Sequence, residues 1–144
     1  MPRPRVAITV GDPAGIGPEI AAKAAVDPRV LAECEPILFA PPPDRAFRAG
    51  QLSADAGQAA YDTIVRAVRA ARAGEVEAIA TAPISKLAFA RAGLPWKGHT
   101  DLLAHLCDAA PVAMLFHAPK LIVVLATVHA VSYTHLTLPT ILLV

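Results

Sequence analysis

The sequence has little charge, and neither sign of charge is in clear excess. Only 17% of its 144 residues are charged, and its 13 basic side chains are balanced by 12 acidic ones. Such a chain produces no long-range field that would attract nucleic acid or an anionic membrane. We therefore predict no nucleic-acid partner and no membrane partner, so that a site for an anion must depend on local groups.

Cysteines and long apolar runs are also scarce. The two cysteines, Cys34 and Cys107, stand far apart in apolar settings, which favours buried free thiols of a reducing compartment over a disulfide or a metal pair. No apolar run approaches the roughly 18 residues of a membrane span. The first apolar run is interrupted at Gly11, too early for a signal-peptide core. We predict a soluble, cytoplasmic protein.

Apolar residues, in contrast, make up 55% of the chain. This content argues against disorder, and the length allows one domain with a core of its own. Short apolar runs alternate with helical periodicity, which predicts an α/β fold with strands at 5–10, 35–40, 77–82, 112–116 and 121–126, and helices at 18–27, 54–73 and 101–107. The continuous apolar character of the last two strands is typical of the interior of a sheet.

Polar residues gather where the strand at 77–82 ends and the helix at 101–107 begins. Thr100 is predicted to be the N-cap of this helix, with the imidazole of His99 just before it. Free amides and the positive helix end would let these groups hold a phosphate or carboxylate of a substrate. The alternative is an ordinary cap beside a surface histidine, and spacing alone leaves both interpretations open.

Two further features carry weaker signals. Glycines at positions 11, 15 and 17 follow the first strand, but their spacing is not that of a dinucleotide-binding loop, and a sharp turn explains them equally well. His129 follows the strand at 121–126, where a side chain can project into a cleft. No second ligand stands at a short helical spacing, so His129 is either a metal ligand or a loop histidine.

Four segments in this order resemble the 4-hydroxythreonine-4-phosphate dehydrogenase family of vitamin B6 biosynthesis: 8–19 (ITVGDPAGIGPE), 81–86 (TAPISK), 98–101 (GHTD) and 125–129 (LATVH). The resemblance implies an NAD-dependent and divalent-metal-dependent oxidation of 4-phosphooxy-threonine, followed by decarboxylation to 3-amino-2-oxopropyl phosphate, on the route to pyridoxine 5'-phosphate. It also implies a three-layer α/β/α fold like that of the isocitrate and isopropylmalate dehydrogenases, of which only the first part is present, and a homodimer in the full-length family.

The resemblance also implies roles for particular residues. Matched by motif, His99 and Thr100 are the substrate-binding pair, and His129 is one of three metal-binding histidines. The metal is expected to be Zn, Mg or Co, because one imidazole does not select among them. The residues that carry out catalysis and bind the cofactor remain unassigned. His105 and His117 receive no role.

The sequence departs from this family in three ways. Family members are much longer, so that the other metal ligands and most of the cofactor site would lie beyond residue 130. The segment between Phe39 and Gln51 looks shorter than in most relatives. Residues 131–144 match nothing in the family, which predicts an incomplete dehydrogenase at 1–130, a foreign tail at 131–144, and no activity for this chain alone.

Two other functions stay open. One is a paralogous dehydrogenase of a four-carbon phosphorylated acid, such as threonate or erythronate phosphate, or of a dihydrodiol acid. The other is a non-catalytic α/β domain that binds a small phosphate ester. His99, Thr100 and His129 do not discriminate among the dehydrogenases.

Overall fold

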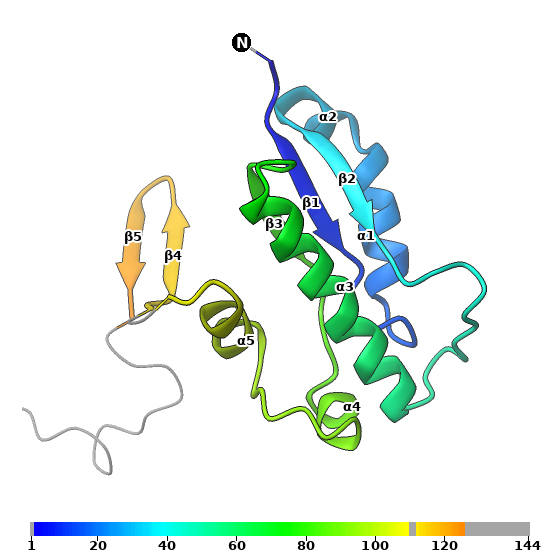
Figure 1. The fold of residues 1–144 in the computed structure, drawn as a ribbon. Helices are drawn as coiled ribbons and strands as arrows, with labels where there is room; N and C mark the ends of the chain where they lie inside the picture. The colour runs from blue at the N-terminus through cyan, green and yellow to red at the C-terminus, as the bar shows by residue number, and fades with distance from the viewer. Residues whose placement is uncertain (1, 110–111, 126–144) are drawn as a thin grey trace, which may run out of the picture. The chain divides into compact units, whose positions relative to one another are not determined.

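A computed structural model describes residues 2–109 and 112–125 of the chain (Figure 1). The chain divides into two compact units, residues 1–108, called the core unit below, and residues 109–144. The core unit contains a three-stranded sheet and five helices. The described part of the second unit is a single β-hairpin.

The sheet of the core unit is parallel, with strand order β2-β1-β3. Its strands are β1 (Arg5–Thr9), β2 (Glu35–Phe39) and β3 (Ala78–Thr81). The helices are α1 (Gly17–Val26), α2 (Pro28–Glu33), α3 (Ala54–Arg72), α4 (Lys86–Arg91) and α5 (His99–Leu106). Parallel pairing brings the carboxyl ends of all three strands to one edge, where open α/β sheets bind their ligands.

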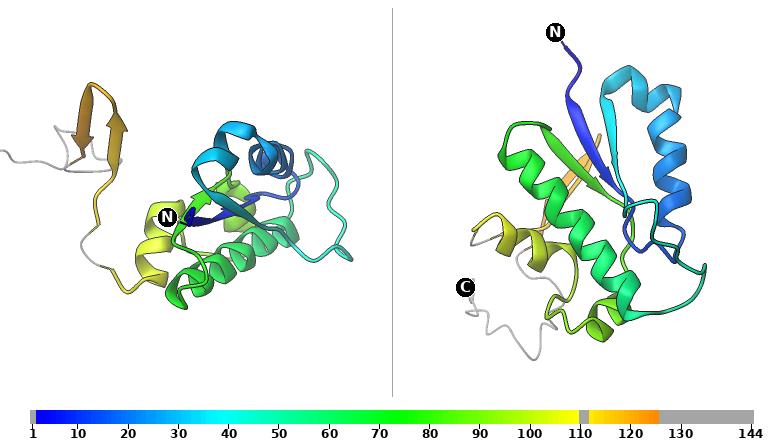
Figure 2. Two further views of the ribbon diagram at one scale, coloured as in Figure 1. Left: turned by 90° about the horizontal axis from the view of Figure 1, so that it is seen from above. Right: turned by 45° about the vertical axis from the view of Figure 1, so that its right-hand side comes forward.

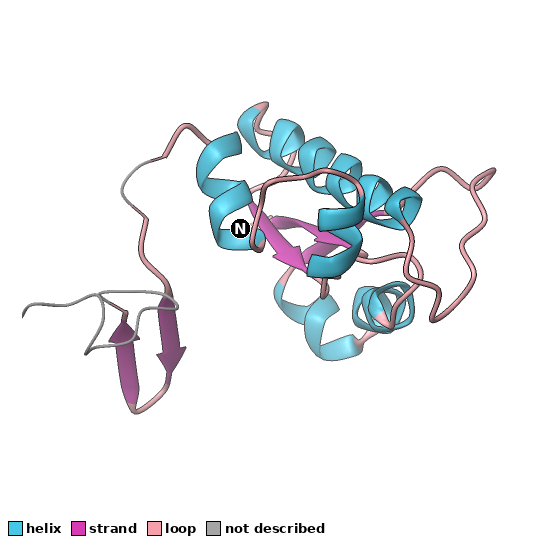
Figure 3. Ribbon diagram, turned by 90° about the horizontal axis from the view of Figure 1, so that it is seen from below, coloured by secondary structure: helices cyan, strands magenta, loops and turns pink. Residues whose placement is uncertain are grey.

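Helices cover both faces of this sheet, as Figures 2 and 3 show. Both faces need a cover because successive side chains of a strand, here β1, point to opposite faces of the sheet. Ile8 packs with Ala21 of α1, whereas Ala7 packs with Ala67 of α3. The middle of the central strand, residues 6–8, is therefore apolar on both faces, and the core unit has the three-layer α/β/α arrangement that the family resemblance implies.

A second cluster lies between α3, α4 and α5. Its fully buried members include Ile64, Phe89 and Leu102, with 0% of each exposed. Close contact of α3 with α4 depends on Gly57, since a Cβ atom there would lie 2.2 Å from the carbonyl oxygen of Ala88. This cluster attaches the two short helices, which carry the polar segments after β3, to the long helix α3.

The loops that follow β1 and β3 meet at the carboxyl edge. Gly11 has φ +65°, and a Cβ atom there would lie 2.2 Å from the carbonyl oxygen of Pro83. The amide of Asp12 donates to that same oxygen at 2.9 Å. Glycine is thus required at position 11 both for its backbone conformation and for the close approach of the two loops.

The predicted strands and helices of the core unit are confirmed within one or two residues, but two short helices were not predicted. Asp27 is the last residue of the predicted helix 18–27, yet its side chain accepts from the amide of Arg29 and starts α2. Ser85 lies outside every predicted strand and helix, yet its hydroxyl accepts from the amide of Ala88 and starts α4. Both helices are six residues long, too short for apolar periodicity to reveal them.

The second unit contains an antiparallel hairpin of β4 (Leu115–Ala118) and β5 (Leu121–Val124). Every residue of both strands is exposed within the described part of the chain. The prediction that these strands lie in the interior of a sheet is therefore wrong for this structure. An apolar run predicts a buried strand, but it does not specify the neighbours that would bury it.

The prediction of buried cysteines is only partly correct. Both thiols are free, but Cys34 is half-buried and Cys107, just after α5, is exposed. The apolar stripe of α5 faces the core, whereas Cys107 lies in the turn that ends the helix. Among the described residues, no helix combines the length and the apolar character needed to span a membrane.

Candidate functional site

His99 and Thr100 form the first turn of α5. The N-cap is Gly98, with φ 174°, and no side chain caps the helix. The prediction that Thr100 is the N-cap is therefore wrong, because the helix begins at His99, two residues earlier than at the predicted Asp101. The imidazole of His99 therefore belongs to the first turn of α5, where the amide groups lack partners inside the helix.

The imidazole of His99 is half-buried, and its Nε2 atom is shut off from solvent. No hydrogen-bond partner for Nε2 exists among the described residues. Burial lowers the pKa of His99 below its usual 6.5, since a charged ring is poorly solvated there. Burial therefore favours the neutral ring, and a nitrogen without a partner in such a place is unusual.

The start of α5 is held in place by contacts along the rest of the helix. Leu102, one turn after His99, is fully buried in the cluster with Phe89. The guanidinium of Arg72 donates to the carbonyl oxygen of Leu106 at 3.1 Å and to the carboxylate of Asp108 at 3.1 Å. These contacts hold the middle and the C-terminal end of α5 against the rest of the core unit.

The loop before α5 is attached to the same helix by an aromatic contact. The rings of Trp96 and His105 lie 4.5 Å apart between centroids, and Trp96 packs against the cluster of α3, α4 and α5. His105 therefore has a structural contact in the core unit. Both sides of the Gly98 turn are thereby connected to the core.

The segment after β3 was singled out with His99 from the sequence. Ile84 packs against the same cluster as α5, and Ser85 caps α4. Lys86 begins α4 and is exposed, so its ammonium group is available to an anion. The two predicted polar segments thus pack on one cluster at the carboxyl end of β3.

Sequence inspection gave no signal for Thr9, the last residue of β1. Its hydroxyl is fully buried and has no partner among the described residues. Thr9 pairs with Thr81 at the carboxyl ends of both strands. Alternation along β1 places its side chain on the α3 face of the sheet, inside the core, so we assign it no role in binding.

His129 lies outside the described residues. The strand before it, β5, pairs with β4 in a sheet separate from β2-β1-β3. From the sequence we also predict that His99, Thr100 and His129 follow strands of one sheet and face one cleft. The strands β3 and β5 belong to different sheets, so the first part of this prediction is wrong. The shared cleft stays a prediction. Within residues 2–109 and 112–125, no three His, Cys, Asp or Glu side chains gather closely enough to hold a metal ion.

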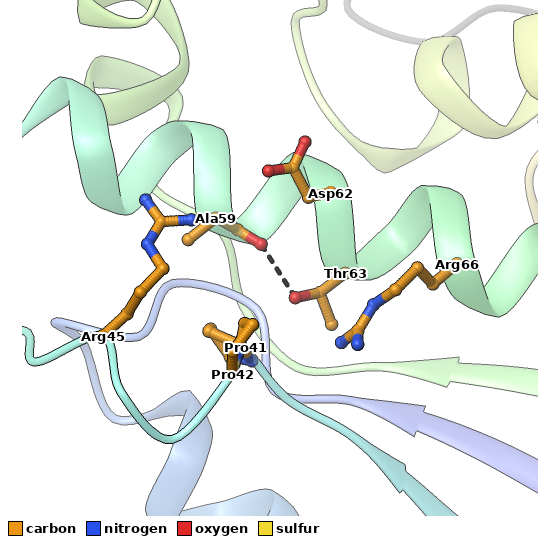
Figure 4. Close-up of a pocket in the computed structure, with 7 residues that line it drawn as sticks. All are labelled: Pro41, Pro42, Arg45, Ala59, Asp62, Thr63 and Arg66. Atoms are coloured by element: carbon orange, nitrogen blue, oxygen red, sulfur yellow. Dashed lines mark hydrogen bonds between the residues drawn. The ribbon is translucent and has the colours of Figure 1, made fainter.

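A pocket of about 150 Å³ lies between α3 and the segment after β2 (Figure 4). Its charged groups already have partners: Arg45 pairs with Asp55, and Arg66 donates to the carbonyl oxygen of Ala40. The hydroxyl of Thr63 donates to the carbonyl oxygen of Ala59 at 2.7 Å. Because these polar groups already have partners within the protein, the pocket gives no indication of a ligand.

The core unit thus belongs to the class of open α/β proteins with a parallel sheet and polar residues at its carboxyl edge. The sequence matches the family model "Pyridoxal phosphate biosynthetic protein PdxA" over residues 16–134. Because this match covers most of the chain, the chain belongs to that family. The match ends inside the segment 131–144, and the foreign origin of that segment stays a prediction.

Relatives with established names fall into two groups. The chain is 35% identical to a 4-hydroxythreonine-4-phosphate dehydrogenase of Trichlorobacter lovleyi, covering 89% of this chain and 50% of that protein. It is 33% identical to a D-threonate 4-phosphate dehydrogenase of Cupriavidus necator, covering 88% and 50%. The chain therefore spans about half the length of the curated relatives that it matches.

Solved structures of dehydrogenases are also similar to this chain. A 4-hydroxythreonine-4-phosphate dehydrogenase from Burkholderia phymatum superimposes with a TM-score of 0.80 at 32% identity, covering 91% of this chain and 52% of that one. A terephthalate 1,2-cis-dihydrodiol dehydrogenase from Burkholderia xenovorans superimposes with a TM-score of 0.60 at 30% identity, covering 74% and 41%. The fold is thus shared by dehydrogenases of different substrates.

The matched region is longer in the relative from Trichlorobacter lovleyi than in this chain. That match spans 169 residues, whereas 89% of these 144 residues is only about 128. This difference agrees with the predicted shortening of the chain, whose position between Phe39 and Gln51 stays a prediction.

Proposed function

We propose that this chain is the N-terminal half of an NAD-dependent and divalent-metal-dependent dehydrogenase that acts on 4-phosphooxy-threonine. The product loses carbon dioxide to give 3-amino-2-oxopropyl phosphate, on the route to pyridoxine 5'-phosphate. Membership of the family supports this proposal, as do the relatives named 4-hydroxythreonine-4-phosphate dehydrogenase. The full-length protein is proposed to be a cytoplasmic homodimer.

The observation that carries the proposal is the start of α5. His99 and Thr100 belong to the matched motif, and they lie in a first turn without a side-chain cap. Amide groups at such a position, with the positive end of the helix, favour a phosphate or carboxylate. The proposed role of this half is to bind the anionic substrate and to orient it.

NAD and the metal are expectations of the family resemblance. His129 is the one proposed metal ligand in this chain, and a catalytic site normally has about three protein ligands. The described residues do not form a metal site, and the dinucleotide spacing is absent from the glycine-rich loop after β1. We therefore expect no NADH formation by the 144-residue chain alone with 4-phosphooxy-threonine, NAD and added metal.

A chimera tests the proposal. Residues 1–130 would replace the corresponding half of the Trichlorobacter lovleyi enzyme, and NADH absorbance would be followed with 4-phosphooxy-threonine. We expect turnover that falls at least tenfold in the variants His99→Ala and His129→Ala, with weaker metal binding only in the second. Arg69→Ala, an exposed change on α3, serves as the control. A well-folded chimera that binds the substrate without turnover would support a binding domain instead.

A second substrate has specific support. The relatives named D-threonate 4-phosphate dehydrogenase match at 33% to 36% identity, as closely as the others. The two substrates differ by an amino group in place of a hydroxyl group, and no described residue has been placed near that position. The chimera should therefore be assayed with both compounds, and the larger kcat/KM identifies the substrate that this half favours.

A further inference from the structure

We infer that Pro36 prevents the outer edge of β2 from pairing with the same strand of a second copy of this chain. β2 pairs with β1 on one side and with no other strand among the described residues. The segment between β2 and α3 is a loop, so it supplies no strand to the other side, called the free edge below (Figure 1). An uncovered strand edge offers its backbone groups to another chain.

The backbone hydrogen bonds of β2 show which residues face the free edge. The amide of Glu35 donates to the carbonyl oxygen of the residue before β1 at 2.8 Å. The carbonyl oxygen of Phe39 accepts from the amide of the residue after β1 at 3.1 Å. Alternate residues of a strand direct their amide and carbonyl groups to the same neighbour. Residues 35, 37 and 39 therefore face β1, whereas Pro36 and Leu38 face the free edge.

Proline at position 36 removes one of the donors on the free edge. Proline has no N–H group, so only the amide of Leu38 remains for a partner strand within β2. In an antiparallel pair of β2 strands related by a two-fold axis at Ile37, Pro36 lies opposite Leu38 of the second copy. Two residues opposed in this way normally exchange two hydrogen bonds, but proline allows only one of them. The place of the missing N–H is taken by the proline ring.

The rest of β2 favours association rather than opposing it. Ile37, Leu38 and Phe39 are apolar, and 44% of Leu38 is exposed. The single charged residue of the strand, Glu35, lies at its start. Apolar strands with an open edge tend to pair with copies of themselves unless a proline or a charge interferes. Pro36 is in the position to interfere, so the homodimer proposed for the full-length protein does not form through β2.

Hydrogen exchange of the wild-type chain tests whether the edge is free. In the ¹⁵N-labelled 144-residue chain, we expect the amide of Leu38 to exchange at least about tenfold faster than the amides of Ile37 and Phe39. The reason is that the latter two donate to β1, whereas the amide of Leu38 has no partner strand. Equal protection of the three amides would show that the edge is already paired, which overturns the inference. This measurement does not depend on the folding of any variant.

Two variants test the role of the proline. Pro36→Val restores an outward amide, whereas the matched control Glu35→Val removes the charge and adds an apolar side chain without adding such an amide. We expect the weight-average mass of Pro36→Val, measured by sedimentation equilibrium, to rise about twofold above that of wild type as the concentration increases, with exchange of the Leu38 amide slowed about tenfold. Glu35→Val should behave like wild type. The fluorescence of Trp96 checks folding.

Two outcomes of the variant experiment would contradict the inference. One is a folded Pro36→Val chain with the mass of wild type and an unprotected Leu38 amide. The other is an equal rise in mass for Glu35→Val, which would show that apolar content, and not the missing N–H group, controls association through β2.

Discussion

The strands of the core unit and those of the hairpin are similarly apolar, yet they have opposite surroundings. β1 has a neighbour on each edge and a helix on each face, so that Ala7 is 0% exposed. β5 pairs with β4 alone among the described residues, and Leu121 is 65% exposed. A run such as Leu-Ile-Val-Val predicts a buried strand, but it does not specify what covers that strand.

The core unit and the hairpin also differ in how much burial stabilises them. Within the core unit, side chains from the sheet pack against those of α1, α3, α4 and α5, and burial of a large apolar side chain stabilises by about 1.5–3 kcal/mol. An isolated two-stranded hairpin is at best marginally stable in water. We therefore expect substitutions in the core unit to have large effects on unfolding and those in the hairpin to have small ones.

The largest contrast is expected between two phenylalanines. Phe89 is 0% exposed, whereas Phe116 in β4 is 55% exposed. Phe89→Ala should lower the free energy of unfolding of the core unit by about 3–5 kcal/mol. Phe116→Ala should change it by less than about 0.5 kcal/mol. Urea denaturation followed by the single tryptophan, Trp96, measures both; equal losses would show that the hairpin contributes to the core.

The next effect tests the close contact between α3 and α4. Alanine in a helix interior is usually more stable than glycine by about 0.5–1 kcal/mol. At Gly57 the added Cβ would lie 2.2 Å from the carbonyl oxygen of Ala88, so Gly57→Ala should instead destabilise by about 1–3 kcal/mol. Gly15→Ala is the control, since its nearest neighbours are at 3.4 Å or more. A stabilised Gly57→Ala variant in the same urea experiment would mean that α4 is not packed this closely.

A smaller effect is expected at the start of α3. The hydroxyl of Ser53 accepts from the amide of Ala56 at 3.1 Å, so Ser53→Ala should cost about 1 kcal/mol. Glu19→Gln removes an exposed i,i+4 pair with Lys23 and should cost no more than about 0.5 kcal/mol. Thermal unfolding by circular dichroism ranks the two variants. If both had equal effects, the cap would add nothing beyond an exposed contact.

The smallest effect is a pH dependence at His99. Because burial lowers the pKa of His99 in the folded state, the unfolded chain takes up a proton first as the pH falls below about 6.5. His99 should therefore favour unfolding on the acid side of pH 6.5, with no such contribution above it. Denaturation midpoints at pH 7.5 and 5.5 should differ less in His99→Gln than in wild type. Identical differences in the two proteins would place the imidazole in solvent.

Some helices were predictable from the sequence, whereas others were missed or given the wrong first residue. The 19-residue helix α3 was predictable because its apolar stripe repeats over five turns. In contrast, α2 and α4 depend on one capping residue each, Asp27 and Ser85, and such residues occur as often in turns. At α5, the sequence predicts Thr100 as the cap, but the helix begins at His99 after Gly98, and Leu102 packs in the cluster with α3 and α4.

The sequence by itself determined the α/β class, the order of the main strands and helices, and the motif that contains His99 and Thr100, because periodicity and capping are local properties. Only the tertiary structure decided that the loop at Gly11 contacts Pro83, that Nε2 of His99 is enclosed without a partner among the described residues, and that β4 and β5 pair apart from the parallel sheet. These features arise from contacts between segments distant in sequence. Such contacts depend on the neighbours that the chain supplies, and no local pattern specifies those neighbours.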